Sequence, residues 1–176
     1  MYNSKTKTIL WSTFVVGILD ATAAIIVYGI FYNYNPIQIY QFVSSAVLSN
    51  NAYNGGIPVA LLGVAFHFFI AFVSSYLFIE FYPKLAVLRQ NKIIVGLVYG
   101  LIIWAVMNLI VIPLTKIPAS GFDTVSVLAI LWHMFVVGLP ISIIAYKFYN
   151  KKTGLKGCLQ QEHLQKQVRR ASLVQQ

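Results

Sequence analysis

Four long apolar stretches dominate the pattern of hydrophobic and polar positions along the chain. The stretches cover residues 9–32, 57–81, 93–112 and 125–146. Each is long enough to cross the roughly 30 Å hydrocarbon layer of a bilayer as a helix that rises about 1.5 Å per residue. Lipid forces backbone groups to satisfy one another, which favours helices. The pattern therefore predicts an all-α fold, an integral membrane four-helix bundle in a single domain over residues 1–150.

A shorter amphipathic segment lies between the first two stretches, over residues 36–48. Asn35 and Pro36 are a typical helix start, with a cap residue followed by proline at the first position. The apolar residues that recur at helical spacing are Ile39, Tyr40, Phe42, Val43, Ala46 and Val47, and the polar residues opposite are Gln38, Gln41, Ser44, Ser45 and Ser49. The spacing predicts a short helix at the outer membrane surface, with a plain connector as the alternative of equal weight.

The composition agrees with a membrane protein. Of 176 residues, 59% are apolar or aromatic and 10% are charged, and the mean hydropathy is +0.74. A soluble domain of this size could not bury so much apolar surface. Cys158 is the only cysteine, so the chain has neither a disulfide framework nor a multi-cysteine metal site.

The net charge of +9 arises from basic residues near the ends of the apolar stretches. These residues are Lys5, Lys7, Lys84, Arg89, Lys92, Lys147, Lys151, Lys152, Lys156, Lys166, Arg169 and Arg170. By the positive-inside rule they predict that both termini are cytoplasmic, with residues 151–176 as a basic cytoplasmic tail. They are not interleaved with a soluble aromatic surface, so we expect the lipid bilayer as the partner and no nucleic acid.

Asp20 is the strongest functional signal, because it is a lone ionisable residue in an uncharged apolar stretch. Helical rise puts His67, Asn108 and His133 near the same depth on the other three stretches. Small residues accompany Asp20 and His67 at helical spacing, which indicates that this side of each helix faces its neighbours. We therefore expect Asp20, His67, Asn108 and His133 to form one polar site inside the bundle.

Three roles for this site stay open. A buried carboxyl beside imidazoles is typical of a proton relay, so we favour non-enzymatic binding or translocation of a proton or a small polar solute. A purely structural or partner-binding role needs only interhelical hydrogen bonds. The third role is a haem or divalent metal site built from His67, His133 and Asp20, although the preferred expectation is no cofactor. No GxSxG, HExxH or thiol nucleophile points to an enzyme.

Several residues bear on how the helices pack. Gly96 and Gly100 form a small-xxx-small pattern that serves close internal packing or, as the alternative, a homo-oligomer contact. Pro140 should free the carbonyl of Val136 and bend the fourth helix, next to His133. The short link after Pro83 predicts antiparallel packing of the second and third helices. The deeper tryptophans, Trp104 and Trp132, are interpreted as packing residues.

One resemblance covers about two-thirds of the chain. The run from His67-Phe68-Phe69-Ile70 to Glu80-Phe81-Tyr82-Pro83-Lys84, then Asn108 to Pro113 and His133, resembles YagU-like bacterial inner-membrane proteins. The resemblance implies a bacterial inner-membrane location and a link to acid tolerance. It supplies no catalytic or binding residues, and the basic tail is not part of it.

Overall fold

The fold is a bundle of helices. The structure is a computed structural model, and it describes residues 4–117 and 121–151. In chain order the elements are α1 (Lys5–Tyr32), α2 (Pro36–Leu48), η1 (Ser49–Asn54), α3 (Gly56–Phe81), η2 (Ala86–Arg89), α4 (Lys92–Val106), η3 (Met107–Val111), η4 (Ile112–Leu114), α5 (Thr124–Trp132) and η5 (His133–Gly138). Within these ranges the chain has no strand. The tail predicted beyond Lys151, Cys158 included, lies outside the described residues.

Four continuous helices are long and apolar enough to cross a membrane. They are Lys5–Tyr32, Gly56–Phe81, Lys92–Leu114 and Thr124–Lys151. Each contains one of the four apolar stretches of the sequence, so the prediction of four helices of this kind is confirmed. The third is α4 continued by η3 and η4, and the fourth is α5 continued by η5 and a last helical segment to Lys151.

Side-chain caps fix where the helices begin. Ser4 accepts a hydrogen bond from the backbone of Lys7 at the start of α1. Asp123 forms a capping box with Ser126 at the start of α5. The first backbone N–H groups of a helix have no partner within the helix, and these oxygens satisfy some of them.

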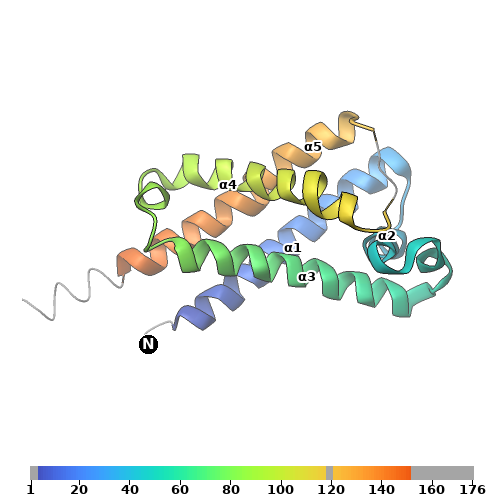
Figure 1. The fold of residues 1–176 in the computed structure, drawn as a ribbon, viewed down its shortest axis with the longest axis horizontal. Coiled ribbons are helices and arrows are strands. Elements are labelled where there is room, and N and C mark those ends of the chain that lie inside the picture. Colours follow the sequence, from blue (N-terminus) through green and yellow to red (C-terminus); the bar gives the residue numbers. More distant parts are fainter. Residues whose placement is uncertain (1–3, 118–120, 152–176) are drawn as a thin grey trace, which may run out of the picture.

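The start of α1 and the end of the last helix lie at the same end of the bundle, as Figure 1 shows. We call this the Glu80 end and the opposite end, where α2 lies, the α2 end. Among the four long helices, the most extensive contacts are those of α1 with α3 and of α4 with η5, and α2 packs against α3. The link through η2 does make α3 and α4 antiparallel, yet these two meet mainly through Tyr99, which donates to the carbonyl of Ser74 (2.8 Å). The predicted antiparallel arrangement is therefore present, and the direct contact between α3 and α4 is limited in extent.

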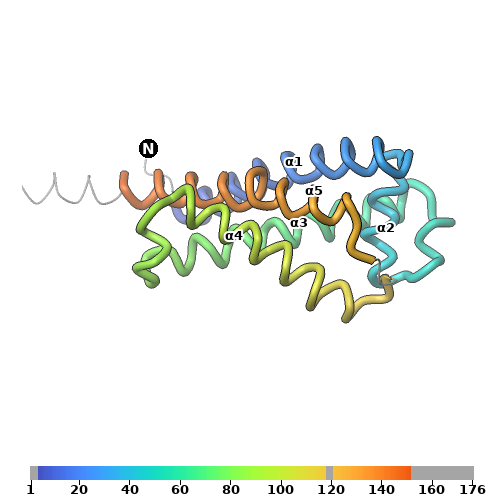
Figure 2. The backbone as a smooth tube through the Cα atoms, turned by 90° about the horizontal axis from the view of Figure 1, so that it is seen from above, coloured from blue at the N-terminus to red at the C-terminus, as the bar shows by residue number. Residues whose placement is uncertain are grey.

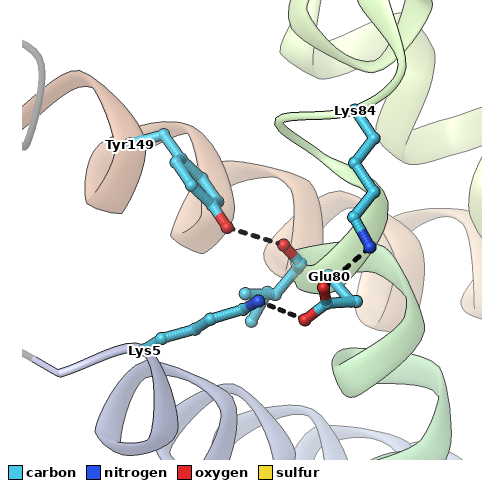
Figure 3. A network of polar contacts seen from close by, with 5 residues as sticks. Lys5, Glu80, Lys84 and Tyr149 are labelled. Carbon is cyan, nitrogen blue, oxygen red and sulfur yellow. Dashed lines mark hydrogen bonds and ion pairs between the residues drawn. The ribbon is translucent and has the colours of Figure 1, made fainter.

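The best-packed core lies in the half of the bundle toward the Glu80 end. Phe78 is 2% exposed, and Ile79, Ile141 and Ala145 are fully buried. A polar network covers this core, drawn in Figure 3: Glu80 binds Lys5 of α1 and Lys84 beyond α3. Tyr149 donates to the carbonyl of Ile79 (2.8 Å). Three of the four long helices are thus joined at this end.

The glycines of α4 pack against η5 inside the chain. A Cβ on Gly100 would lie 2.2 Å from the carbonyl oxygen of His133, and one on Gly138 would lie 2.2 Å from the carbonyl oxygen of Gly96. Such distances leave no room for any side chain. The internal-packing interpretation of Gly96 and Gly100 therefore describes this contact, and a homo-oligomer contact through the same face would have to open the helix pair.

Two helices change to π-helical geometry in their middle. One π segment is η3, which contains Asn108, and the other is η5, which starts at His133. Pro140 has no N–H and so cannot donate to the carbonyl one turn before it. Directly before Pro140, the N–H of Leu139 bonds to the carbonyl of Met134, which gives the wider turn of a π-helix. π-Helical segments are rare and occur frequently at functional sites.

The helix expected over residues 36–48 is present as α2, with a capping box at Asn35. Figure 2 shows α2 running across the long axis of the bundle. Three of its polar residues, Gln41, Ser44 and Ser45, are buried, whereas a helix lying on the membrane surface would turn them to water. Gln41 donates to the carbonyl of Gly56 (3.2 Å) and Ser44 to that of Val59 (2.7 Å). These polar residues therefore join α2 to the first turn of α3.

Candidate functional site

Asp20 of α1 and His67 of α3 lie next to each other in the middle of their helices. The Oδ2 atom of Asp20 is 3.9 Å from Nδ1 of His67, which is longer than a direct hydrogen bond. The carboxyl side chain is 23% exposed and the imidazole 14%, so both are mostly enclosed by the protein. The two spans thus bring together the acid and base that the sequence placed at one depth.

The other nitrogen of His67 fixes the protonation pattern of the ring. Its Nε2 atom lies 2.9 Å from the carbonyl oxygen of Gly17. A carbonyl oxygen only accepts, so Nε2 carries a proton and donates it. In the neutral ring Nδ1 is then an acceptor, facing the carboxyl group of Asp20. Because both atoms are acceptors in this tautomer, a hydrogen-bond donor placed between them would satisfy both.

Trp132 of α5 completes this network. Its indole Nε1 donates to Oδ1 of Asp20 at 3.0 Å. Trp132 also packs against the rings of Tyr28 and His133, so the sequence interpretation of Trp132 as a packing residue was incomplete. A signal was present, because an indole N–H deep in an apolar helix needs an acceptor, and Asp20 is the one acidic residue within the first 79 positions. The buried N–H of Trp104 differs, since it has no acceptor within the described chain.

His133 and Asn108 are held by their own helices. Nδ1 of His133 donates to the carbonyl of Ala129 (2.6 Å), which leaves its Nε2 as an acceptor in the neutral ring. Asn108 donates to the carbonyl of Trp104 (2.9 Å). Both residues belong to π-helical segments, whose wider turn changes which carbonyls are paired. Neither of them is hydrogen-bonded to the Asp20–His67 pair.

All four predicted residues nevertheless line one cavity of about 350 Å³. Ligand pockets commonly occupy roughly 300–1,000 Å³. The wall of this cavity is formed by Val16, Asp20, Tyr28, Phe42, Val43, Ala46, Val47, Phe66, His67, Phe69, Ile70, Ala71, Ser74, Ile103, Trp104, Met107, Asn108, Val111, Ile112, Thr115, Ile117, Ala129, Trp132, His133 and Val137. The site is a mainly apolar chamber with a polar group on each of the four long helices.

The metal alternative finds limited support in this geometry. Within residues 4–117 and 121–151 no three His, Cys, Asp or Glu side chains are grouped to hold a metal ion. His67 and His133 each donate one ring N–H to a backbone carbonyl, which leaves the other nitrogen of each ring as a possible ligand. A two-residue set of Asp20 and His67 falls short of the four ligands that zinc usually takes.

A second acidic residue, Asp123, lies at the α2 end and outside the helices. It accepts a hydrogen bond from Tyr32 and forms the capping box with Ser126. The bond from Tyr32, followed by those from Ser126, lowers the pKa of Asp123 below its usual value of 3.8. Asp123 is therefore a charged cap that joins the ends of α1 and α5, and it does not line the cavity.

Comparison with protein-family models, with curated proteins and with solved structures finds no match to this chain. The fold and the site define its class as a helical protein whose described part has four helices of membrane-spanning length and a partly open cavity with polar residues on its wall.

Proposed function

We propose that this protein binds a proton, or a small polar solute that exchanges with one, at Asp20 and His67 inside a four-span membrane bundle. The observation that carries the proposal is the pairing of Oδ2 of Asp20 with Nδ1 of His67 at 3.9 Å, while Nε2 of His67 is committed to Gly17. Ionisable residues within membrane spans commonly mark ion or solute pathways. The role is non-enzymatic binding or translocation.

The gap within the pair favours an exchangeable proton over a fixed ion pair. At 3.9 Å there is room for the proton to be relayed by a water or a solute atom that touches both groups. The cavity beside the pair provides the space for such a molecule. A purely structural ion pair would not require a cavity beside it.

The location in the cell is part of the same proposal. Lys5, Lys84, Lys92 and Lys147 belong to helix ends at the Glu80 end, where α1 begins and the last helix ends. The positive-inside rule puts that end in the cytoplasm. The resemblance to YagU-like proteins adds a bacterial inner membrane and a role in acid tolerance, which suits a proton-binding site.

Proton flux in reconstituted vesicles tests the proposal. Vesicles that contain the protein and an enclosed pH dye should acidify under an imposed proton gradient, and Asp20→Asn should reduce that flux by on the order of tenfold or more, because the carboxyl is the group that exchanges. Asp123→Asn is the matched control, since Asp123 lies away from the cavity, and it should leave the flux unchanged. Equal flux in wild type and Asp20→Asn would refute the proposal.

A structural role is the second candidate, because the same network joins three helices. Trp132 of α5 binds Asp20 of α1, and His67 of α3 binds Gly17 of α1. Asp20→Asn separates the two roles, since the amide keeps an acceptor for Trp132 but cannot exchange a proton at neutral pH. A variant that melts at the wild-type temperature and has lost flux supports proton binding. A variant that is destabilised and conducts normally supports the structural role.

A further inference from the structure

The two histidines of the cavity have used their ring hydrogens on other parts of the protein. His67 donates to Gly17, and His133 donates to Ala129. What these rings have left is one lone pair each, on Nδ1 of His67 and Nε2 of His133. The carboxyl of Asp20 also has an oxygen, Oδ2, that Trp132 does not occupy. These groups give the cavity three acceptor atoms, and its wall also carries the amide of Asn108 and the indole N–H of Trp104, which has no acceptor within the described chain.

The charged residues of the cavity wall also favour a positively charged ligand. Asp20 lines it, and none of its described wall residues is a lysine or an arginine, although the whole chain has a net charge of +9. Aromatic rings make up much of the remaining wall, contributed by Tyr28, Phe42, Phe66, Phe69, Trp104 and Trp132. Aromatic faces attract organic cations, most strongly when water is excluded. A wall of this kind disfavours an anion and favours a cation with an apolar body.

The same cavity reaches the side of the bundle. The third long helix diverges from the others in its second half, where α4 passes into η3, as Figure 2 shows. Two wall residues are exposed at the surface: Phe69 of α3 is 63% exposed and Val47 of α2 is 53% exposed. In a membrane this surface faces acyl chains. A molecule dissolved in the lipid could therefore reach the cavity sideways, past Phe69 of α3.

We infer that the solute is a lipophilic organic cation, an amine or quaternary ammonium with an apolar body, whose charged group binds at Asp20 in place of a proton. This inference rests on the proposed function and names the class of solute. The exchange is balanced in charge: one cation binds the Asp20 carboxylate, and one proton leaves the Asp20–His67 pair for the solvent. The aromatic wall holds the apolar body, and the lone pairs of His67 and His133 face the positive group.

The test uses the full chain in lipid nanodiscs and the probe benzyltrimethylammonium, with binding followed by calorimetry. Neopentylbenzene, in which carbon replaces the charged nitrogen, is the matched neutral probe, and benzenesulfonate is the anionic one. We expect the cation to bind and the other two to bind on the order of tenfold more weakly, because the recognition is electrostatic. In weak buffer, binding should release about one proton per cation at a pH where the pair is protonated. Affinity should therefore rise with pH.

Variants of the protein make the test specific. Asp20→Asn should weaken cation binding by on the order of tenfold or more, since it removes the one carboxyl group among the described wall residues. Asp20→Glu keeps the charge and should bind the cation within a few-fold of wild type. Asp123→Asn should bind as wild type does. Normal melting of Asp20→Asn verifies that it folds, and normal binding by Asp20→Glu verifies the site if Asp20→Asn does not fold.

The outcomes separate this inference from the proposed function. Equal binding of benzyltrimethylammonium and neopentylbenzene, or no binding of the cation, would overturn the inference. If Asp20-dependent proton flux persisted in that case, the proposed function would stand without it. If the cation bound through Asp20 with no proton release and no proton flux, the proton exchange would be wrong. The site would then be a simple cation site.

Discussion

The two ends of the bundle are built differently. At the Glu80 end, Phe78, Ile79 and Ile141 fill the space between helices, and Glu80 binds lysines on both sides. Toward the α2 end the helices separate around a cavity of about 350 Å³, and two of them change to π-helical geometry beside it. The bundle is thus closely packed at one end and contains a cavity in its other half.

This difference shows how a small bundle can combine stability with a site. Close packing and interhelical hydrogen bonds hold membrane helices together, because lipid supplies no hydrophobic driving force between them. The Glu80 end, with the contacts of Gly96, Gly100 and Gly138, supplies that packing. The cavity half can then leave Asp20 and His67 without a direct hydrogen bond between them. Exchange of a proton or solute needs this freedom.

Truncation of one phenylalanine in each half is the most severe test of the comparison. Phe78→Ala should lower the free energy of unfolding by about 3 kcal/mol, because it opens a cavity in a filled core. Phe66→Ala should cost clearly less, since Phe66 already borders an empty space. Unfolding in mixed detergent micelles measures both. Equal losses at the two positions would contradict the contrast between a closed and a hollow half.

The glycine contact between α4 and η5 gives the next largest effect. Gly100→Ala should destabilise the fold by about 2 kcal/mol, because the new Cβ would meet the backbone of His133 and Met134 and force the helices apart. Gly29→Ala is the control, since its Cβ would have no neighbour closer than 3.6 Å. Alanine there should be neutral or slightly stabilising. Thermal melting of the two variants checks the difference, and a tolerated Gly100→Ala would refute the close helix contact.

The smallest expected effect is the pH dependence of the cap at the α2 end. The pKa of Asp123 is lowered in the folded protein by Tyr32 and Ser126, so its contribution to stability is complete above the usual pKa of 3.8. That contribution is lost as the pH falls below this value and through the lowered pKa. Asp123→Asn, which retains a capping oxygen, should lack this part of the dependence. The melting temperatures of both proteins, measured at about pH 6, 4 and 3, give this difference in pH dependence.

If wild type and Asp123→Asn lost stability in parallel on acidification, the charged cap would have no such role. The residues at the Glu80 end are the same in both proteins, so the comparison isolates the α2 end.

The sequence was sufficient for the four long helices and for the depth of the polar residues. Apolar length and helical rise determine both, and neither depends on which helices are neighbours. It was insufficient for Trp132 and for α2. In both cases the sequence did not reveal the hydrogen-bond partners. These partners depend on the packing of helices that are far apart in the chain. Gln41 and Ser44 look like a water-facing side until α3 is seen against them.

By itself, the sequence determined that four helices are long and apolar enough to cross a membrane. It also determined that each carries one residue of the set Asp20, His67, Asn108 and His133 at a similar depth, because both follow from spacing along single helices. Only the tertiary structure decided that Asp20 and His67 are paired while Asn108 and His133 are held by their own helices. It also decided that all four share one cavity. The physical reason is that the contacts depend on how each helix is rotated about its axis and on the angle at which helices cross. Packing across the whole bundle determines the rotation and the crossing angle.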